Sequence, residues 1–364
     1  MLRSRKSVLI TAGLALFVAA GTLLVYSGYL RSGIAGASPA TELLSEVPTG
    51  APTLVYLDLA AIRASWFYQH RPDQTPLTLP DSDYAKFVQA TGFDFEKDLD
   101  RVAIASWPQS LSQEQKSTVA VADGRFDKQK IRDYATKNGK LDHQQGREVF
   151  LFQTRQPAGA ESTKSSTESP WTSLVFLDDH RIAMVEGSSI APIFESRGAS
   201  SAADPMRERE ARVNGAAAFV ISRAPAVPDN FAPGGMQSTQ LATLLRSVQW
   251  VTLAARPEGE NLRVSLEGEC LTDTDARQLQ STIETLRMFG QAALEGSKTR
   301  QSMDPAAFGV LDNLLKTADV KATAERVRIL VEVTPDVLKL GSKQKQAAGE
   351  EDRGKSSDPK KSIR

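Results

Sequence analysis

The sequence predicts an α+β protein held in a membrane: an N-terminal transmembrane helix, then two related units of antiparallel sheet with helices packed on one face. Three observations lead to this prediction. Residues 8–30 form a run of 23 residues without a charged side chain. Beyond this run, short strand-like segments rich in aliphatic and aromatic residues alternate with amphipathic helical patterns. Three patterns of the first half also return, in the same order, in the second half.

The run at residues 8–30 is long enough to cross a bilayer. As a helix it spans about 34 Å, whereas the hydrocarbon core is about 30 Å thick. Three basic residues precede the run and only Arg31 follows it closely; the three are Arg3, Arg5 and Lys6. Because positive charge is retained in the cytoplasm, we expect residues 1–7 inside and the rest of the chain outside. We expect the chain to cross the inner (cytoplasmic) membrane once. The bulk of the chain is then periplasmic or otherwise extracytoplasmic.

A cleaved signal peptide is the competing interpretation of this run. Ala35-Gly36-Ala37 has the small-residue spacing of a cleavage site. The apolar core of a signal peptide usually holds about 7–15 residues, so the longer run favours an uncleaved anchor. A bacterial lipid anchor would need a cysteine just after the run, and the only cysteine of the chain is Cys270.

Composition divides the rest of the chain. It predicts a tether at 31–40, a first α+β unit at 41–198 with a flexible insertion at 156–170, a second unit at 199–340, and a tail at 341–364. The tail has almost no large apolar residue, so it cannot offset the entropy of ordering and is expected to be disordered. The 44 basic and 44 acidic residues balance, so the charge does not favour nucleic-acid binding.

The first unit is predicted to contain six strands. Runs of apolar residues place them at 53–59, 102–107, 117–122, 149–153, 172–177 and 180–186. Asp127 is placed to cap a helix that carries Ile131 and Ala135 on one face and ends at Asn138-Gly139. Shorter helices are expected from residue 82 and from residue 188.

The second unit shows a similar order of predicted strands and helices. Strands are predicted at 216–222, 247–255, 261–270, 320–324 and 326–333, and shorter helices at 206–211 and 240–246. Thr272 or Asp273 caps the longest helical pattern of this unit. Two apolar stripes are expected to face the core. The first consists of Ala276, Leu279, Ile283, Leu286 and Phe289, and the second of Phe308, Leu311 and Leu315.

An internal duplication would explain why the two units look alike. Residues 47–55 and 213–220 both place a glycine-containing turn before an apolar strand. Residues 121–127 and 266–273 both end a strand before an acidic helix cap, and residues 178–182 and 325–329 both precede a strand. Three ordered matches separated by about 145–165 residues favour two copies of one unit, with helices laid over an antiparallel sheet.

No histidine spacing indicates a metal site. His70, His143 and His180 fall in predicted loops or turns, and none is paired at zinc-ligand spacing. His180 follows Asp178-Asp179, which suggests a metal site or an acid–base pair, although a polar hairpin turn explains the sequence better. We therefore predict no metal ligand and no cofactor.

Acidic and small-residue clusters also have plain structural interpretations. The run from Asp94 to Asp100 resembles the start of a calcium loop but has Leu99 where such a loop needs glycine, so a solvated turn is expected. The segment 272–275 is interpreted as a helix cap. Gly187-Ser188-Ser189 lacks the pattern of a nucleophile elbow, Cys270 is expected to be a small buried residue, and no nucleotide-binding glycine motif occurs. We therefore predict no catalytic residue.

The order of features resembles that of uncharacterised, membrane-anchored bacterial envelope proteins described as domains of unknown function. The segments that carry the resemblance are 47–59, Thr91-Gly92-Phe93, 98–100, 124–126, Cys270 and 273–276. The resemblance implies an envelope protein with an anchored α+β ectodomain, and it implies no catalytic residues.

Three functions are compatible with these observations. The leading hypothesis is a non-enzymatic envelope protein that is anchored through residues 8–30 and serves binding or assembly with an envelope partner. The second is a carrier or sensor of an apolar ligand, held in a pocket between helices and sheet. The third is a hydrolase whose residues are too scattered for the sequence to reveal.

Overall fold

The structure is a computed structural model that describes residues 39–70, 82–107, 117–153, 171–195, 205–224, 246–296 and 305–337. The predicted anchor at 8–30, the insertion at 156–170 and the tail at 341–364 lie outside the described residues, as does nearly all of the helix predicted at 240–246. Among the helices that the structure describes, none combines the length and apolarity needed to cross a membrane.

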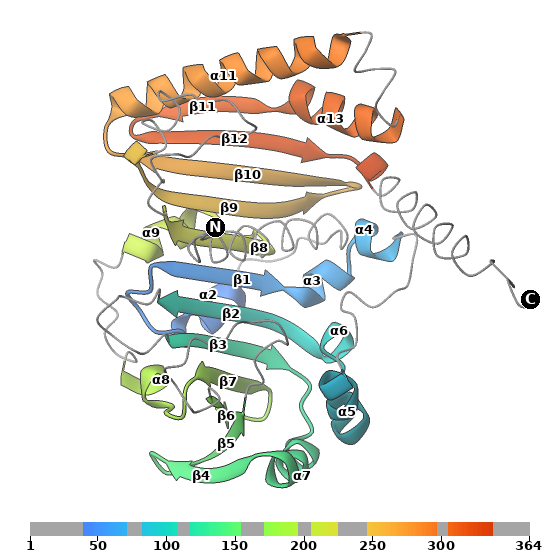
Figure 1. The fold of residues 1–364 in the computed structure, drawn as a ribbon, viewed down its shortest axis with the longest axis vertical. Coiled ribbons are helices and arrows are strands. Elements are labelled where there is room, and N and C mark those ends of the chain that lie inside the picture. The colour runs from blue at the N-terminus through green and yellow to red at the C-terminus, as the bar shows by residue number, and fades with distance from the viewer. Residues whose placement is uncertain are drawn as a thin grey trace, which may run out of the picture.

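One continuous antiparallel sheet of 12 strands organises the described residues (Figure 1). The strand order is β11-β12-β10-β9-β8-β1-β2-β3-β7-β6-β5-β4. Strands of the first half are β1 (Thr53–Asp58), β2 (Leu99–Trp107), β3 (Ser117–Gly124), β4 (Lys140–Gln144), β5 (Arg147–Gln153), β6 (Trp171–Phe176) and β7 (Arg181–Glu186). Strands of the second half are β8 (Ala218–Arg223), β9 (Val248–Glu258), β10 (Asn261–Cys270), β11 (Asp319–Thr323) and β12 (Arg326–Val333).

The two halves meet at the antiparallel pair β1 and β8. Val55 lies opposite Val220 near the middle of this pair. Hydrogen bonds from Asp58 N to Ala217 O (2.7 Å) and from Arg223 N to Pro52 O (2.8 Å) extend the pair at both ends. The two predicted units therefore share one sheet.

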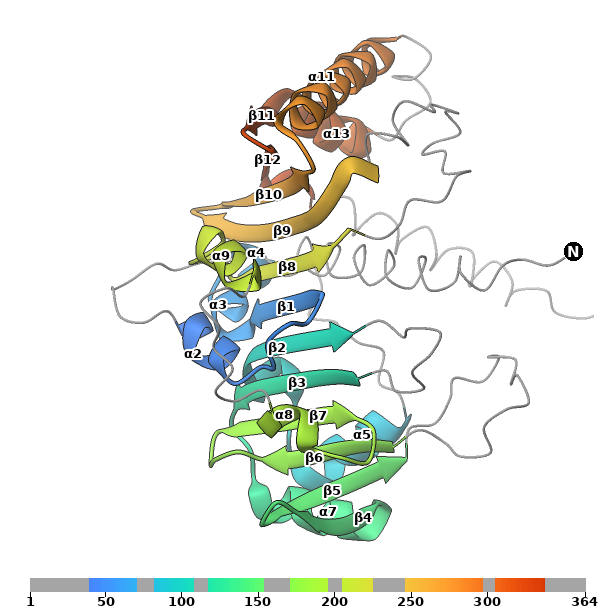
Figure 2. The ribbon, with the colours of Figure 1, turned by 90° about the vertical axis from the view of Figure 1, so that its left-hand side faces the viewer.

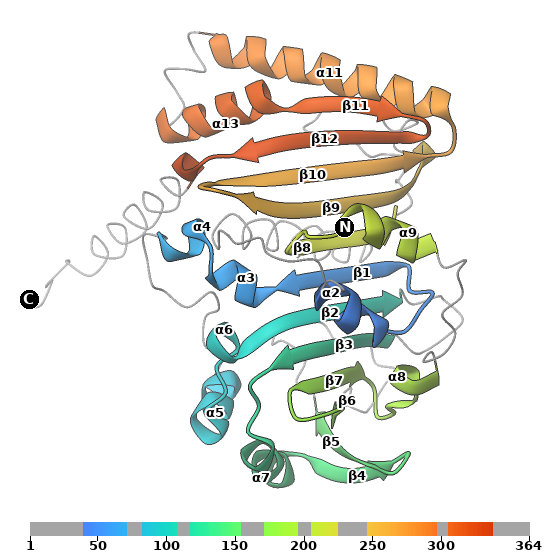
Figure 3. The same ribbon diagram turned by 180° about the vertical axis from the view of Figure 1, so that it is seen from behind.

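Helices cover both faces of the sheet, so the prediction that they pack on one face is wrong. Three of them, α2 (Pro39–Ser45), α8 (Ala191–Glu195) and α9 (Pro205–Arg212), lie on the face toward which Leu54 and Tyr56 point, here called the α2 face (Figure 3). The opposite face, to which Leu57 and Val327 belong, is called the α11 face. Its helices are α3 (Leu59–Arg63), α4 (Trp66–Gln69), α5 (Ser82–Thr91), α7 (Lys128–Asn138), α11 (Asp273–Glu295) and α13 (Pro305–Thr317). Figure 2 shows the sheet edge-on, with α2 and α9 on one side of it.

Helices cover both faces of the sheet because the central strands are apolar on both faces. On β1, Leu54 and Tyr56 are buried on the α2 face, whereas Leu57 packs into a cluster on the other. A strand with two apolar faces needs cover on each side.

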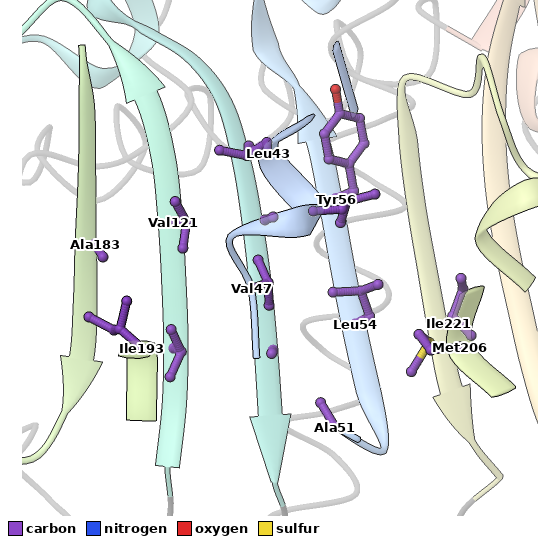
Figure 4. Close-up of a cluster of buried hydrophobic side chains, with 14 of the residues drawn as sticks. Leu43, Val47, Ala51, Leu54, Tyr56, Val121, Ala183, Ile193, Met206 and Ile221 are labelled. Carbon is purple, nitrogen blue, oxygen red and sulfur yellow. The ribbon is translucent and has the colours of Figure 1, made fainter. Parts of the chain in front are cut away.

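The core of the α2 face joins both halves of the chain (Figure 4). Leu43 and Val47 of the first half pack in the same cluster as Met206 and Ile221 of the second. Tyr56 and Phe219 stack across the central strand pair with their ring centroids 5.2 Å apart. This shared core holds the ends of β1, β2 and β3 in place next to α2, where the candidate site lies.

Most strands and caps follow the sequence predictions. Asp127 Oδ1 accepts a hydrogen bond from Lys130 N (3.1 Å) at the start of α7, and Thr272 Oγ1 accepts one from Asp275 N (3.1 Å) at the start of α11. The strand β4 was not predicted, because almost every side chain on it is exposed and polar. Two predicted core positions are wrong, since Phe289 is 68% exposed and Leu311 is 38% exposed.

Candidate functional site

An open cleft on the α2 face brings together some of the charged residues that the sequence singled out, namely Asp100, Asp178, Asp179 and His180. It encloses about 550 Å³ at the ends of β2, β3 and β7, beside α2. The lining residues are Glu42, Asp100, Arg101, Asp123, Gly124, Arg125, Asp178, Asp179, His180 and Arg181. The crevice between α2 and α9 is smaller and has fewer ionisable side chains in its lining.

Asp123, at the end of β3, is the centre of the cleft. Asp58, Arg101, Asp123 and Arg181 lie opposite one another on four neighbouring strands, which puts all four side chains on one face. Arg181 Nε lies 2.6 Å from Asp123 Oδ1, and Arg101 Nη1 lies 3.5 Å from Asp123 Oδ2. Both arginines therefore pair with the same carboxylate.

The helix α2 completes the pairing of Arg181. Glu42 Oε1 lies 3.2 Å from Arg181 Nη2, and Glu46 Oε1 lies 3.7 Å from Arg181 Nη1. Hydrogen bonding to Asp123 raises the pKa of Arg181 above its usual value, with Glu42 adding to the shift. Arg181 therefore stays charged and acts as a tie between the helix and the sheet.

A second set of ion pairs includes Asp100 and Arg125, which also line the cleft. Arg63 Nη2 lies 2.5 Å from Asp100 Oδ1, and Arg125 lies 3.6 Å from Asp100 and 3.5 Å from Asp98. The acidic run is not the solvated turn that we predicted. Its first residue, Asp94, caps the short helix α6 (Phe95–Asp98), and its later carboxylates pair with these arginines.

His180, Asp178 and Asp179 lie together in the turn before β7, as predicted. Asp178 Oδ1 accepts a hydrogen bond from His180 N at 2.7 Å, and Lys128 Nζ lies 2.5 Å from Asp179 Oδ1. All three residues are exposed. The carboxylates thus support the turn and α7, and neither orients the imidazole of His180 as an acid–base partner would.

The other candidates of the sequence lie apart from the cleft. His70 stacks on Trp66, and His143 lies on the exposed strand β4, which corrects its predicted place in a loop. Ser189 Oγ accepts a hydrogen bond from Ala191 N (3.2 Å) before α8. Cys270 is 4% exposed as predicted, and burial raises the pKa of its thiol. Within the described ranges, no group of three or more histidine, cysteine, aspartate or glutamate residues is arranged to hold a metal ion.

The sequence contained both Asp123 and Arg181 but did not reveal their contact. They are 58 residues apart, and only the register of β3 against β7 places them opposite each other. A usable signal was available, since each is a charged residue at the end of an apolar strand. Two such residues lie opposite each other when the strands pair antiparallel with these ends side by side.

The fold resembles that of TP0453. Crystal forms I, III and IV of this Treponema pallidum protein match with TM-scores of 0.40, 0.41 and 0.42 at 11% sequence identity. The matches cover 81–82% of this chain and 94–96% of TP0453. No protein-family model and no curated protein matches the sequence. At this distance the likeness transfers no residue role to the cleft.

A smaller crevice separates α2 from α9. It is lined partly by Leu44, Leu54 and Met206 and encloses about 10 Å³, roughly the room for one water molecule. An apolar ligand of ordinary size would need several hundred Å³. In the part of the chain that the structure describes, this crevice does not support the carrier hypothesis.

The pH dependence of stability is predicted to involve Asp58. Burial raises the pKa of its carboxyl above the usual value of about 4, although Ala61 N donates to it at 2.7 Å and Arg101 lies nearby. A raised folded-state pKa stabilises the fold below the unfolded pKa, and this contribution is lost as the pH rises through the folded pKa. Asp58→Asn keeps an acceptor for Ala61 N but does not titrate.

We therefore expect the free energy of unfolding of Asp58→Asn, minus that of the unsubstituted protein, to be larger at pH 7 than at pH 4, so the substitution is more stabilising at pH 7. Urea unfolding at both pH values measures it. Asp142→Asn, at an exposed position on β4 whose carboxyl pKa is lowered, should show the opposite trend. If the difference in unfolding free energy between Asp58→Asn and the unsubstituted protein were the same at both pH values, the raised pKa of Asp58 would be ruled out.

Proposed function

We propose that this chain is a membrane-anchored protein of the cell envelope, with residues 8–30 as its anchor and an extracytoplasmic sheet that serves binding or assembly without catalysis. The observation that carries the proposal is the uncharged run at residues 8–30, preceded by three basic residues. A span of about 20 apolar residues is what a bilayer selects for, and the charge asymmetry sets its direction.

The chemistry of the cleft supports the non-enzymatic part of the proposal. Arg101 and Arg181 both pair with Asp123, while Arg63 and Arg125 both pair with Asp100. Side chains held in such a network brace strands and helices against each other. A general base or nucleophile instead needs a side chain directed at a substrate.

The anchor is tested by extraction of the full chain from membranes with alkaline carbonate. We expect the protein to stay with the membrane and the variant Leu16→Arg/Ala20→Arg to be released, because each arginine near the centre of a span costs about 3 kcal/mol. The matched variant Leu16→Ile/Ala20→Val should stay in the membrane. Release of the unsubstituted chain would refute the proposed anchor.

We further propose that the two units, at 41–198 and 199–340, are copies of one ancestral unit. The turn before β1 and the turn before β8 each contain a glycine with positive φ, Gly50 at 77° and Gly215 at 78°. Corresponding hydrogen bonds join Gly124 N to His180 O (2.9 Å) and Cys270 N to Glu325 O (2.7 Å). Superposition of an experimental structure on itself is expected to match β1, β2, β3 and β7 with β8, β9, β10 and β12. A different best match would contradict common ancestry.

A further inference from the structure

The second half has a cross-strand row on the α2 face that corresponds to the row in the cleft. Arg223, Trp250, Glu269 and Arg326 lie opposite one another on β8, β9, β10 and β12. The row in the cleft, from Asp58 to Arg181, occupies the same positions on β1, β2, β3 and β7. The α2 face therefore has two equivalent ends, and their charges can be compared.

The charges of the two ends are opposite in sign. In the cleft, α2 adds Glu42 and Glu46 to the row, so two arginines face four carboxylates. At the other end, α9 adds Arg209 and Arg212 to Arg223 and Arg326 of the row, and these four arginines meet three carboxylates, Glu269 of the row together with Glu208 and Glu267, which pair with Arg212. The α2 face is thus acidic at one end and basic at the other.

The arginines of α9 occupy the carboxylates that would otherwise neutralise β12. Arg209 and Arg212 both pair with Glu269, and Arg212 Nε lies 2.9 Å from Glu267 Oε1. Arg209 is also held over the ring of Trp250 at 4.2 Å. Arg326 lies opposite Glu269, and Arg328 lies opposite Glu267. Arg326 and Arg328 therefore face carboxylates that are already paired with the arginines of α9.

Three guanidinium groups are left over, Arg223, Arg326 and Arg328, here called the arginine strip. None of them forms an ion pair with a residue that the structure describes, although Arg223 lies 5.4 Å from the Trp250 ring. Arg223 and Arg328 are exposed, and Arg326 is half-buried. Strand spacing puts Arg223 and Arg326 about 14 Å apart, with Arg328 about 7 Å further along β12. Lys321, beside Arg328, is paired with Asp319 at 2.7 Å and adds no free charge.

The chain enters the fold on the same face. The helix α2 begins at Pro39, only eight residues after the end of the proposed anchor at residue 30. Eight residues reach at most about 29 Å even when fully extended. If the anchor is in the bilayer, the α2 face is tethered close to the lipid headgroups. Arginine binds phosphate oxygens with its planar fork, and attraction of a basic segment to an anionic surface acts within a Debye length of about 8–10 Å.

We propose that the arginine strip docks on anionic phospholipid headgroups of the membrane that holds the anchor, and that the acidic end of the same face, which α2 joins to the anchor, stays off the bilayer within the reach of those eight residues. This inference rests on the proposed anchoring through residues 8–30. It makes the second half a lipid-facing contact and leaves the cleft turned toward the aqueous space. The chain would then lie against the bilayer at one end.

The test measures the distance of the strip from the bilayer in the full chain. The protein, with Cys270→Ala and Thr323→Cys, is labelled with a fluorophore and reconstituted in vesicles that contain headgroup-quenching lipids. Thr323 is exposed and lies opposite Arg326. A second reporter, Ala292→Cys on the exposed side of α11, reports from the other face. Vesicles of phosphatidylcholine alone are compared with vesicles that contain about one third phosphatidylglycerol.

We expect quenching at residue 323 with phosphatidylglycerol at low salt, loss of quenching at high salt, and little quenching at residue 292. Each arginine removed should weaken lipid contact about five-fold, so Arg223→Gln/Arg326→Gln/Arg328→Gln should abolish it. The matched variant Lys130→Gln/Arg132→Gln/Lys137→Gln removes three positive charges from exposed positions on α7 and should not change it.

Four results would overturn the inference. Quenching that is equal in both lipids, or that survives in the triple arginine variant, would exclude anionic headgroups as the partner. Quenching that depends on protein density instead of lipid charge would identify a second copy as the partner. These three results would leave the anchor intact, because the chain would still be inserted. A chain that does not insert into the vesicles would refute the anchor and the inference together.

Discussion

Replacing Glu269 with alanine is expected to lower the free energy of unfolding by about 3–5 kcal/mol. The carboxylate pairs with both Arg209 and Arg212, whose side chains are only 9% and 19% exposed. Removing one partner of a buried ion pair leaves an uncompensated charge, which costs about that much. Urea unfolding followed by tryptophan fluorescence and by circular dichroism measures the change.

A matched variant separates this effect from the loss of any glutamate on the sheet. Glu258→Ala on β9 removes the partner of Arg263, but these side chains are 37% and 48% exposed. An exposed pair contributes about 0–1 kcal/mol, so this change should be small. The double variant Glu269→Gln/Arg209→Met should recover part of the loss, because it removes a buried charge from each side of the network. Equal effects of Glu269→Ala and Glu258→Ala would show that the network around α9 is not desolvated.

Phe67→Ala is expected to destabilise the fold by about 3–5 kcal/mol, as is usual for deletion of a buried aromatic ring. Phe67 on α4 is 0% exposed and packs in a cluster with Leu262 and Val333. Because Phe67 belongs to the first half and its neighbours to the second, the cavity would weaken the contact between the halves. Thermal and urea unfolding of the full chain measure the loss.

The control uses a phenylalanine that the sequence placed in the core. Phe289 on α11 is 68% exposed, so Phe289→Ala should change the free energy of unfolding by no more than about 0.5 kcal/mol. If Phe289→Ala were as destabilising as Phe67→Ala, the outward orientation of this part of α11 would be wrong.

Local patterns predicted the elements well because their causes are local. The carboxylate of Asp127 and the hydroxyl of Thr272 accept hydrogen bonds from backbone N–H groups in the first turns of α7 and α11. Both capping residues are recognisable from sequence alone. The β9–β10 hairpin was equally clear from two apolar strands separated by a turn. These features depend on neighbours within a few residues.

The errors come from features that depend on distant segments. Phe289 continues the apolar spacing of α11, but in this part of the helix Arg287 and Gln291 bond to Leu315 O of α13, and the side that carries Phe289 is exposed. Helices were expected on one face because the apolar character of β1 on its second face was not weighed. Sequence periodicity indicates which side of a helix is apolar, and the partner surface decides whether that side is buried.

The cleft was only partly foreseen. His180 with Asp178, and the acidic run from Asp94, were recognised separately, and the structure places members of both in one cleft. Asp123 and Arg181, which hold the cleft together, were missed because strand register brings them into contact. The opposite charges of α2 and α9 are visible in the sequence, but their meaning depends on knowing which strand each helix covers.

The most direct test of the account is the topology of the full chain. Single-cysteine variants in a Cys270→Ala background, one at Ser4→Cys and one at Lys137→Cys, are treated with a membrane-impermeant maleimide in spheroplasts. Ser4 precedes the proposed anchor, and Lys137 is exposed on α7. We predict labelling at residue 137 in intact spheroplasts and labelling at residue 4 only after lysis. Labelling at residue 4 with protection at residue 137 would contradict an anchored sheet on the extracytoplasmic side.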